Sequence, residues 1–182
     1  MKKSLVLAMI AAVTAAPAFA ADSGFYIGAN VGKATLSGSP YSDFAKKSDT
    51  SLGLLGGYQV NKNLAVEMQY IDFGKSYAQA AYPIKTTGVS LSAVGILPVS
   101  GSFSVFGKLG VASTTLKVDC GACSPANYSV TKTAIAYGLG GQYNFTQALG
   151  IRIGYDKYAI GKSSEQTDGT YGVISAGVVY KF

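Results

Sequence analysis

The sequence predicts an all-β fold, an eight-stranded antiparallel up-and-down transmembrane β-barrel. Three observations lead to this prediction. The chain opens with a secretory leader. Although 48% of the residues are hydrophobic, no apolar run after the leader reaches the roughly 20 residues that a membrane-spanning helix needs. Instead, apolar residues alternate with polar or small ones, as in strands that face lipid on one side.

Residues 1–20 are interpreted as a signal peptide and residues 21–182 as the barrel domain. Lys2 and Lys3 supply the positive start, an apolar run covers 5–13, and the small residues Ala18 and Ala20 precede the expected cleavage point. The formal net charge of +6 arises from 15 basic and 9 acidic residues. The basic residues are scattered, so a nucleic-acid partner is not expected.

Eight segments alternate in this way, at about 24–33, 51–60, 63–73, 87–97, 103–115, 133–145, 148–158 and 171–182. Residues of one parity share a face of a strand, and a membrane barrel presents an apolar face to lipid on every strand. In chain order, the residues expected to face lipid are Phe25, Ile27, Ala29 and Val31; Leu52, Leu54, Gly56, Tyr58 and Val60; Leu64, Val66, Met68 and Tyr70; Val89, Leu91, Ala93 and Leu97; Phe103, Val105, Leu109 and Val111; Ile135, Tyr137, Leu139, Tyr143 and Phe145; Leu149, Ile151, Ile153 and Tyr155; and Ile174, Ala176, Val178, Tyr180 and Phe182.

The opposite parity carries glycine, serine and the charged residues of the strand interiors, so it is expected to face a packed lumen. A soluble lipocalin-like carrier would need the reverse polarity, and Lys108 and Arg152 on this face argue against it. A narrow interior also accommodates some inward aliphatic side chains, here Leu55, Val94, Ile96, Val173 and Val179.

Short and long connections alternate along the chain. The short ones cover 61–63, 98–102 and 146–147, and the long ones about 34–50, 74–86, 116–132 and 159–170. Outer-membrane barrels have short periplasmic turns and longer external loops. Aromatic residues are then expected near the periplasmic interface at Phe25, Tyr58, Phe103, Tyr143, Phe145, Tyr180 and Phe182, and near the outer one at Tyr70 and Tyr155.

Several short motifs resemble a known family. The chain contains GFYIG at 24–28, GGYQV at 56–60, NLAVE at 63–67 and a terminal GVVYKF at 177–182. Over essentially the whole mature chain it resembles the eight-stranded membrane domain of OmpA and the small barrels of the OmpX and Ail types. The resemblance implies the bacterial outer membrane, with Tyr180 and Phe182 as the signal that the outer-membrane assembly machinery reads. OmpA also carries a peptidoglycan-binding domain after its barrel; this sequence ends at Phe182, so that role is not expected.

Three charged residues are expected to meet inside the lumen. Glu67, Lys108 and Arg152 all have inward parity, on strands that rise from the periplasm. Because an isolated buried charge is very costly, we expect a Glu67–Arg152 ion pair with Lys108 as a competing partner. OmpA-type barrels have an interior acid–base network interpreted as a gate, and Gln142 stands where they have a second acid. Two interpretations stay open, a plugged lumen and a gated pore of low conductance.

No enzymatic chemistry is expected. The chain has no histidine, so a serine or water nucleophile has no obvious general base, and no catalytic residue, metal site or cofactor is predicted. Cys120 and Cys123 form a CGAC motif, expected as a loop disulfide in an oxidising compartment rather than a redox pair at a helix start. The acids that lie in loops or at strand ends without recognisable pairing are Asp22, Asp43, Asp49, Asp72, Asp119, Glu165 and Asp168.

The expected function is that of a structural outer-membrane barrel with surface-exposed loops, with a low-conductance or gated pore as an open possibility. The alternative is an adhesion or ligand-binding protein of the Ail and OmpX type. The expected partners are outer-membrane lipid, lipopolysaccharide and the assembly machinery, and the expected state is a monomer. Loop residues that bear on the alternative, but equally fit loop packing or lipopolysaccharide contact, are Tyr41, Phe44, Lys46, Lys47, Tyr77, Tyr82 and Tyr128.

Overall fold

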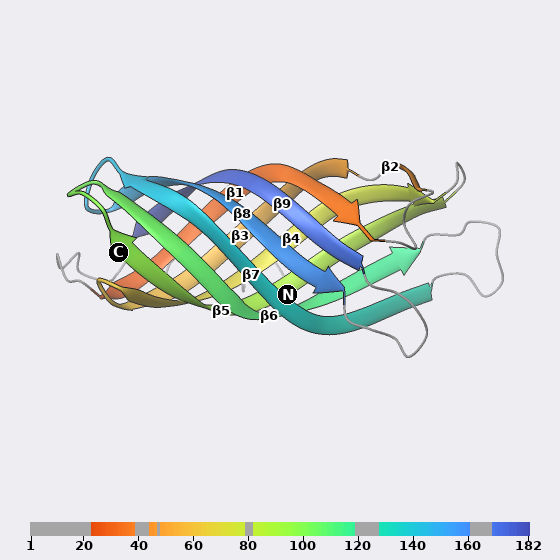
Figure 1. The fold of residues 1–182 in the computed structure, drawn as a ribbon, viewed down its shortest axis with the longest axis horizontal. Coiled ribbons are helices and arrows are strands. Elements are labelled where there is room, and N and C mark those ends of the chain that lie inside the picture. The colour runs from red at the N-terminus through yellow and green to blue at the C-terminus, as the bar shows by residue number, and fades with distance from the viewer. Residues whose placement is uncertain (1–22, 39–43, 47, 79–81, 119–127, 161–168) are drawn as a thin grey trace, which may run out of the picture.

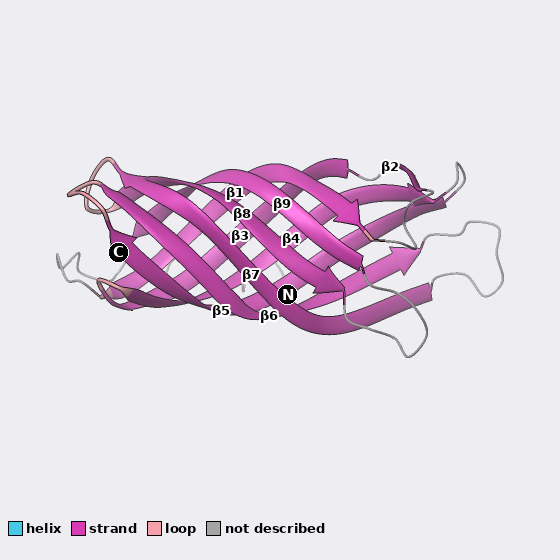
Figure 2. Ribbon diagram, in the orientation of Figure 1, coloured by secondary structure: helices cyan, strands magenta, loops and turns pink. Residues whose placement is uncertain are grey.

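A computed structural model of the chain describes residues 23–38, 44–46, 48–78, 82–118, 128–160 and 169–182. The ordered elements are all strands (Figures 1 and 2). Among the described residues, no helix is long and apolar enough to cross a membrane. The strands are β1 (Gly24–Ser37), β2 (Phe44–Lys46), β3 (Ser48–Asn61), β4 (Leu64–Ala78), β5 (Tyr82–Pro98), β6 (Phe103–Val118), β7 (Tyr128–Asn144), β8 (Leu149–Ile160) and β9 (Gly169–Lys181).

The strands close into an antiparallel up-and-down barrel. Strand β1 pairs with β3 on one side and with β9 on the other, and β4 pairs with β5, so neighbours in the chain are neighbours around the wall. The short β2 pairs only with the outer end of β4 and lies outside this circuit. Eight strands therefore form the barrel, and the predicted fold class is confirmed.

The predicted strands are too short at one end of the barrel. Strand β5 begins at residue 82 rather than 87, and β7 begins at 128 rather than 133, so parts of the expected long connections are strand. These extensions are rich in threonine, serine and lysine. The antiparallel backbone pairing continues through them, and in the β7 extension the Oγ1 atoms of Thr115 and Thr131 also lie 2.9 Å apart across the strands. Phe44, Tyr77, Tyr82 and Tyr128 consequently belong to strands, while Tyr41 lies outside the described residues.

The outer wall is apolar, as the parity of the strands predicts. Leu54, Leu109, Leu139 and Ile153 are 60–66% exposed, although they lie in the middle of strands. Figure 1 shows the three short turns and the C-terminus together at one end of the barrel, which we take as the periplasmic end. The aromatic residues expected at this end are on the outer surface, with Phe25 against Tyr58 at a ring separation of 4.8 Å and Tyr143 against Phe145 at 5.3 Å.

The lumen holds two apolar clusters of buried side chains. The periplasmic cluster consists of Tyr26, Leu55, Ala65, Val94, Phe106 and Val179, with Ile96 packed against it. The outer cluster consists of Ala34, Leu36, Ile71, Phe73, Ala112, Ala136, Tyr158, Tyr171 and Val173. All five aliphatic residues predicted to point inward belong to or pack against these clusters, which confirms that part of the prediction.

Candidate functional site

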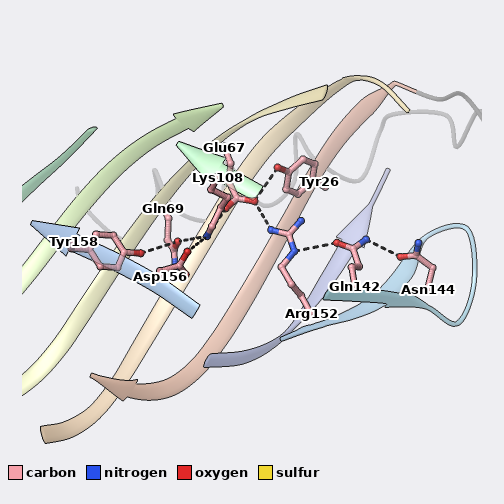
Figure 3. A network of polar contacts seen from close by, with 9 residues as sticks. All are labelled: Tyr26, Glu67, Gln69, Lys108, Gln142, Asn144, Arg152, Asp156 and Tyr158. Carbon is pink, nitrogen blue, oxygen red and sulfur yellow. Dashed lines mark hydrogen bonds and ion pairs between the residues drawn. The ribbon is translucent and has the colours of Figure 1, made fainter. Parts of the chain in front are cut away.

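A layer of charged side chains lies between the two apolar clusters (Figure 3). We call Glu67, Lys108, Arg152 and Asp156 the charge layer. On β4, Glu67 lies between Ala65 of the periplasmic cluster and Ile71 of the outer cluster, and β6 and β8 supply the other three residues. The strand alternation directs all four side chains into the lumen, because they have inward parity on their strands.

Glu67 is the centre of the layer. Its side chain is 1% exposed, and Arg152 Nη1 donates to Glu67 Oε2 at 2.5 Å. Tyr26 OH donates to the same oxygen at 3.0 Å, and Lys108 Nζ donates to Oε1 at 3.4 Å. The structure therefore brings together the three charged residues expected to meet, with Arg152 as the nearer cation. Such donors offset much of the cost of burying the carboxylate.

Asp156 is a second acid that the sequence analysis did not include. Its Oδ1 lies 2.9 Å from Lys108 Nζ, whereas Glu67 Oε1 lies 3.4 Å from the same nitrogen. Lys108 also donates to Gln69 Oε1 at 3.4 Å. The signal was present in the sequence, since Asp156 shares the parity of Arg152 on β8. The second acid of the layer therefore lies on β8 and not on β7, where Gln142 stands.

Gln142 lies beside the layer and continues it toward the periplasmic end. Arg152 Nε donates to Gln142 Oε1 at 3.1 Å, and Gln142 Nε2 donates to Asn144 Oδ1 at 2.8 Å. The Arg152 guanidinium also lies 4.6 Å from the centre of the Phe106 ring, within the range of a cation–π contact. Arg152 is thus held by an acid, an amide and an aromatic face.

Little open space lies beside Lys108 and Asp156 in the charge layer. Two cavities border Lys108 and Asp156, and each has a volume of about 10 Å³, near the minimum that one water molecule needs. The layer contains two acids and two bases, so its formal charges balance. An ion-paired layer of this kind is weak evidence for stability, but removing one member leaves an uncompensated buried charge. Beside Lys108 and Asp156 there is room for about one water molecule in each cavity.

The other predicted site residues lie elsewhere or outside the described residues. Tyr180 and Phe182 lie at the periplasmic end, with ring centres 4.9 Å apart. Cys120, Cys123 and residues 1–20 lie outside the described residues, so the disulfide and the signal peptide stay predictions. The expectation that Asp72 has no recognisable partner is wrong, because Lys85 Nζ lies 3.1 Å from its Oδ2 across the β4–β5 pair. Within the described chain, no three potential His, Cys, Asp or Glu ligands gather at one point.

Comparisons with known proteins agree with this architecture. Outer membrane protein P5 of Haemophilus influenzae is 29% identical over all of this chain, and outer membrane protein A of Salmonella typhi is 28% identical. The chain spans 61% and 56% of the length of these relatives. Among solved structures, Neisserial surface protein A matches with a TM-score of 0.73 at 23% identity, covering 88% of this chain and 99% of that one.

The Ail protein of Yersinia pestis, solved in complex with the heparin analogue sucrose octasulfate, matches with a TM-score of 0.62 at 19% identity over 88% of this chain and 99% of that one. At these identities the two structural matches show a shared fold. The family model described as "Outer membrane protein beta-barrel domain" matches residues 5–182. Together with the closed barrel and its lipid-facing belt, this match shows that the chain belongs to the outer-membrane protein β-barrel domain family and is a bacterial outer-membrane protein.

Proposed function

We propose that the protein is a structural outer-membrane barrel that spans the bilayer with a closed lumen and presents its strand ends and connections at the cell surface. The observation that supports this most directly is the charge layer, which lies in the lumen between two apolar clusters and leaves cavities of about 10 Å³ beside Lys108 and Asp156. The outward belt of exposed apolar side chains is the surface through which it would contact lipid and lipopolysaccharide. We propose that it does so as a monomer.

Conductance across planar bilayers tests this function. The refolded chain should give a silent baseline or rare, small events, because passage requires the Glu67–Arg152 contact to break. A steady ohmic current from the wild-type protein would overturn the proposal. A Lys33→Ala variant is the matched control, since Lys33 is exposed on the outside of β1 and its removal should leave the baseline unchanged.

A gated pore of low conductance is the second candidate, and one observation favours it. Lys108 Nζ lies within 3.4 Å of Glu67 and 2.9 Å of Asp156, so this cation has two acids between which it can move. If partner exchange opens the lumen, then Lys108→Ala and Asp156→Asn should change the frequency of the rare events. The absence of channel events in the wild type and in both variants would exclude the pore.

Binding at the cell surface through external loops stays a prediction. It concerns segments such as residues 119–127, which lie outside the described residues. The likeness to Ail, whose structure contains a heparin analogue, makes sulfated glycans a reasonable first probe. Cell binding that survives deletion of 119–127 would exclude that loop. The proposed reading of Tyr180 and Phe182 by the assembly machinery is testable by truncating the terminal residue and measuring insertion.

A further inference from the structure

A larger cavity opens below the charge layer, at the end of the barrel that carries the short turns. Its volume is about 230 Å³, and residues from all three short turns border it, including Lys62, Gly101 and Gln147. We call it the periplasmic vestibule. The side chains that matter for its chemistry are Gln59, Lys62, Gln142, Asn144, Arg152 and Lys181.

Basic side chains border the vestibule. Lys62, Arg152 and Lys181 border it, and none of the described residues that line it is acidic. Glu67, the acid that pairs with Arg152, lies on the far side of the guanidinium and is not part of the lining. A concave site lined by one sign of charge concentrates ions of the opposite sign.

The hydrogen-bond chain that leaves Arg152 runs through Gln142 to Asn144 (Figure 3), and all three residues line the vestibule. A guanidinium can only donate, so Gln142 must turn its Oε1 toward Arg152 and its Nε2 toward Asn144. Asn144 must then present Oδ1 to Gln142, at 2.8 Å, and keep its Nδ2 donors for another acceptor. The charge of Arg152 therefore fixes the orientation of both amides, and the chain ends in a donor at the wall of the vestibule.

We propose that the periplasmic vestibule is a binding site for a small anion, a carboxylate or a phosphate ester, that enters from the periplasm. The volume of the vestibule limits the ligand to a small molecule, because it lies below the roughly 300–1,000 Å³ of pockets that hold drug-sized ligands. Asn144 Nδ2 and the Lys62 ammonium donate to the anion, and the apolar roof of Ile96, Phe106 and Val179 keeps bulk water from one side of it. Binding does not require conduction, so a silent barrel can still hold the ligand.

Calorimetric titration of the refolded full chain in a non-ionic detergent tests the proposal, with inorganic phosphate and succinate as probes and erythritol as the neutral comparison. Phosphate, succinate or both should bind, and erythritol should not. The two affinities show whether the site prefers a phosphate or a carboxylate. Lys62→Gln should weaken binding about tenfold, the loss expected for one charge-assisted hydrogen bond. Asn144→Asp should abolish it, because a donor becomes a negative charge.

The matched control is Lys33→Gln, which removes a lysine of the outer surface at the opposite end of β1 and should leave the affinity unchanged. Heat-dependent gel migration checks that each variant has folded. Lys62 lies in an exposed turn, so Lys62→Gln should fold and still tests the proposal if Asn144→Asp does not refold. Equal affinity in the wild type and Lys62→Gln, binding of erythritol as strong as that of succinate, or no binding of either anion at millimolar concentration would overturn the proposal.

Discussion

Replacement of Glu67 by glutamine removes the one carboxylate on which Arg152, Lys108 and Tyr26 converge. Among the described residues, Glu67 is the acid that contacts the Arg152 guanidinium, so Glu67→Gln leaves a buried cation without its counter-ion. Removing one partner of a buried ion pair costs about 3–5 kcal/mol. We expect the free energy of unfolding to fall by this amount, measured by reversible guanidinium or urea unfolding of the barrel in lipid vesicles.

Two other variants, compared with Glu67→Gln, test this prediction more closely. Arg152→Gln should cost less, about 1–3 kcal/mol, because Glu67 keeps Tyr26 OH at 3.0 Å and Lys108 Nζ at 3.4 Å. Asp72→Asn should cost no more than about 1 kcal/mol, because Asp72 pairs with Lys85 on the surface. An Arg152→Gln loss larger than that of Glu67→Gln would refute the reasoning.

The double variant Glu67→Gln/Arg152→Gln separates a direct pair from two independent effects. It removes both charges together, so it should be more stable than the sum of the single losses predicts, by about 0.5–3 kcal/mol. The contact of 2.5 Å between Arg152 Nη1 and Glu67 Oε2 is the reason. Strictly additive losses would show that the two side chains do not stabilise each other.

Two further predictions concern the barrel wall. Leu139→Arg places a charge near the middle of the lipid-facing belt and should lower the free energy of unfolding in vesicles by about 2–4 kcal/mol. Leu97→Arg, next to a periplasmic turn, should lower it by no more than about 1 kcal/mol, and equal losses would contradict the assigned depth. Gly140→Ala places a methyl group against the Ile153 carbonyl oxygen and 2.5 Å from Phe106 Cζ, and should cost about 1–3 kcal/mol by overpacking. Gly107→Ala, whose nearest neighbour would lie 4.0 Å away, is its control and should unfold like the wild type.

The alternation of the sequence predicts the fold because lipid imposes one rule on every strand. Ile151 and Ile153 face outward and Arg152 between them faces the lumen, as parity requires. This rule does not apply to the parts of the strands that extend beyond the bilayer. Above the belt the outward face of a strand no longer meets lipid. In the extension of β7 the exposed outward positions are Ser129 and Thr131 and the apolar Val130 has the inward parity, so the lipid-facing pattern stops and the predicted strand was too short.

Strand parity predicts that the candidate site faces the lumen, but it does not fix the level of every side chain along the barrel axis. Parity places Glu67, Lys108 and Arg152 in the lumen, and the cost of an isolated charge predicts that they meet. It gives no measure of strand tilt, so it does not show that Asp156, four residues beyond Arg152 on β8, reaches Lys108. The vestibule was missed for another reason, since it depends on turns whose geometry the alternation does not encode.

Arg152 contacts Glu67 in the charge layer and also borders the vestibule, so under the proposed function the strength of this contact would limit any conduction. If opening requires Arg152 to leave Glu67 without a substitute, a cost of about 3–5 kcal/mol keeps the open fraction between about 10⁻² and 10⁻⁴. Lys108, already 3.4 Å from Glu67, lowers this cost by taking over the carboxylate. Lys108→Ala removes this substitute and should therefore make openings rarer, whereas a plug held only by packing would open more often once the side chain is gone.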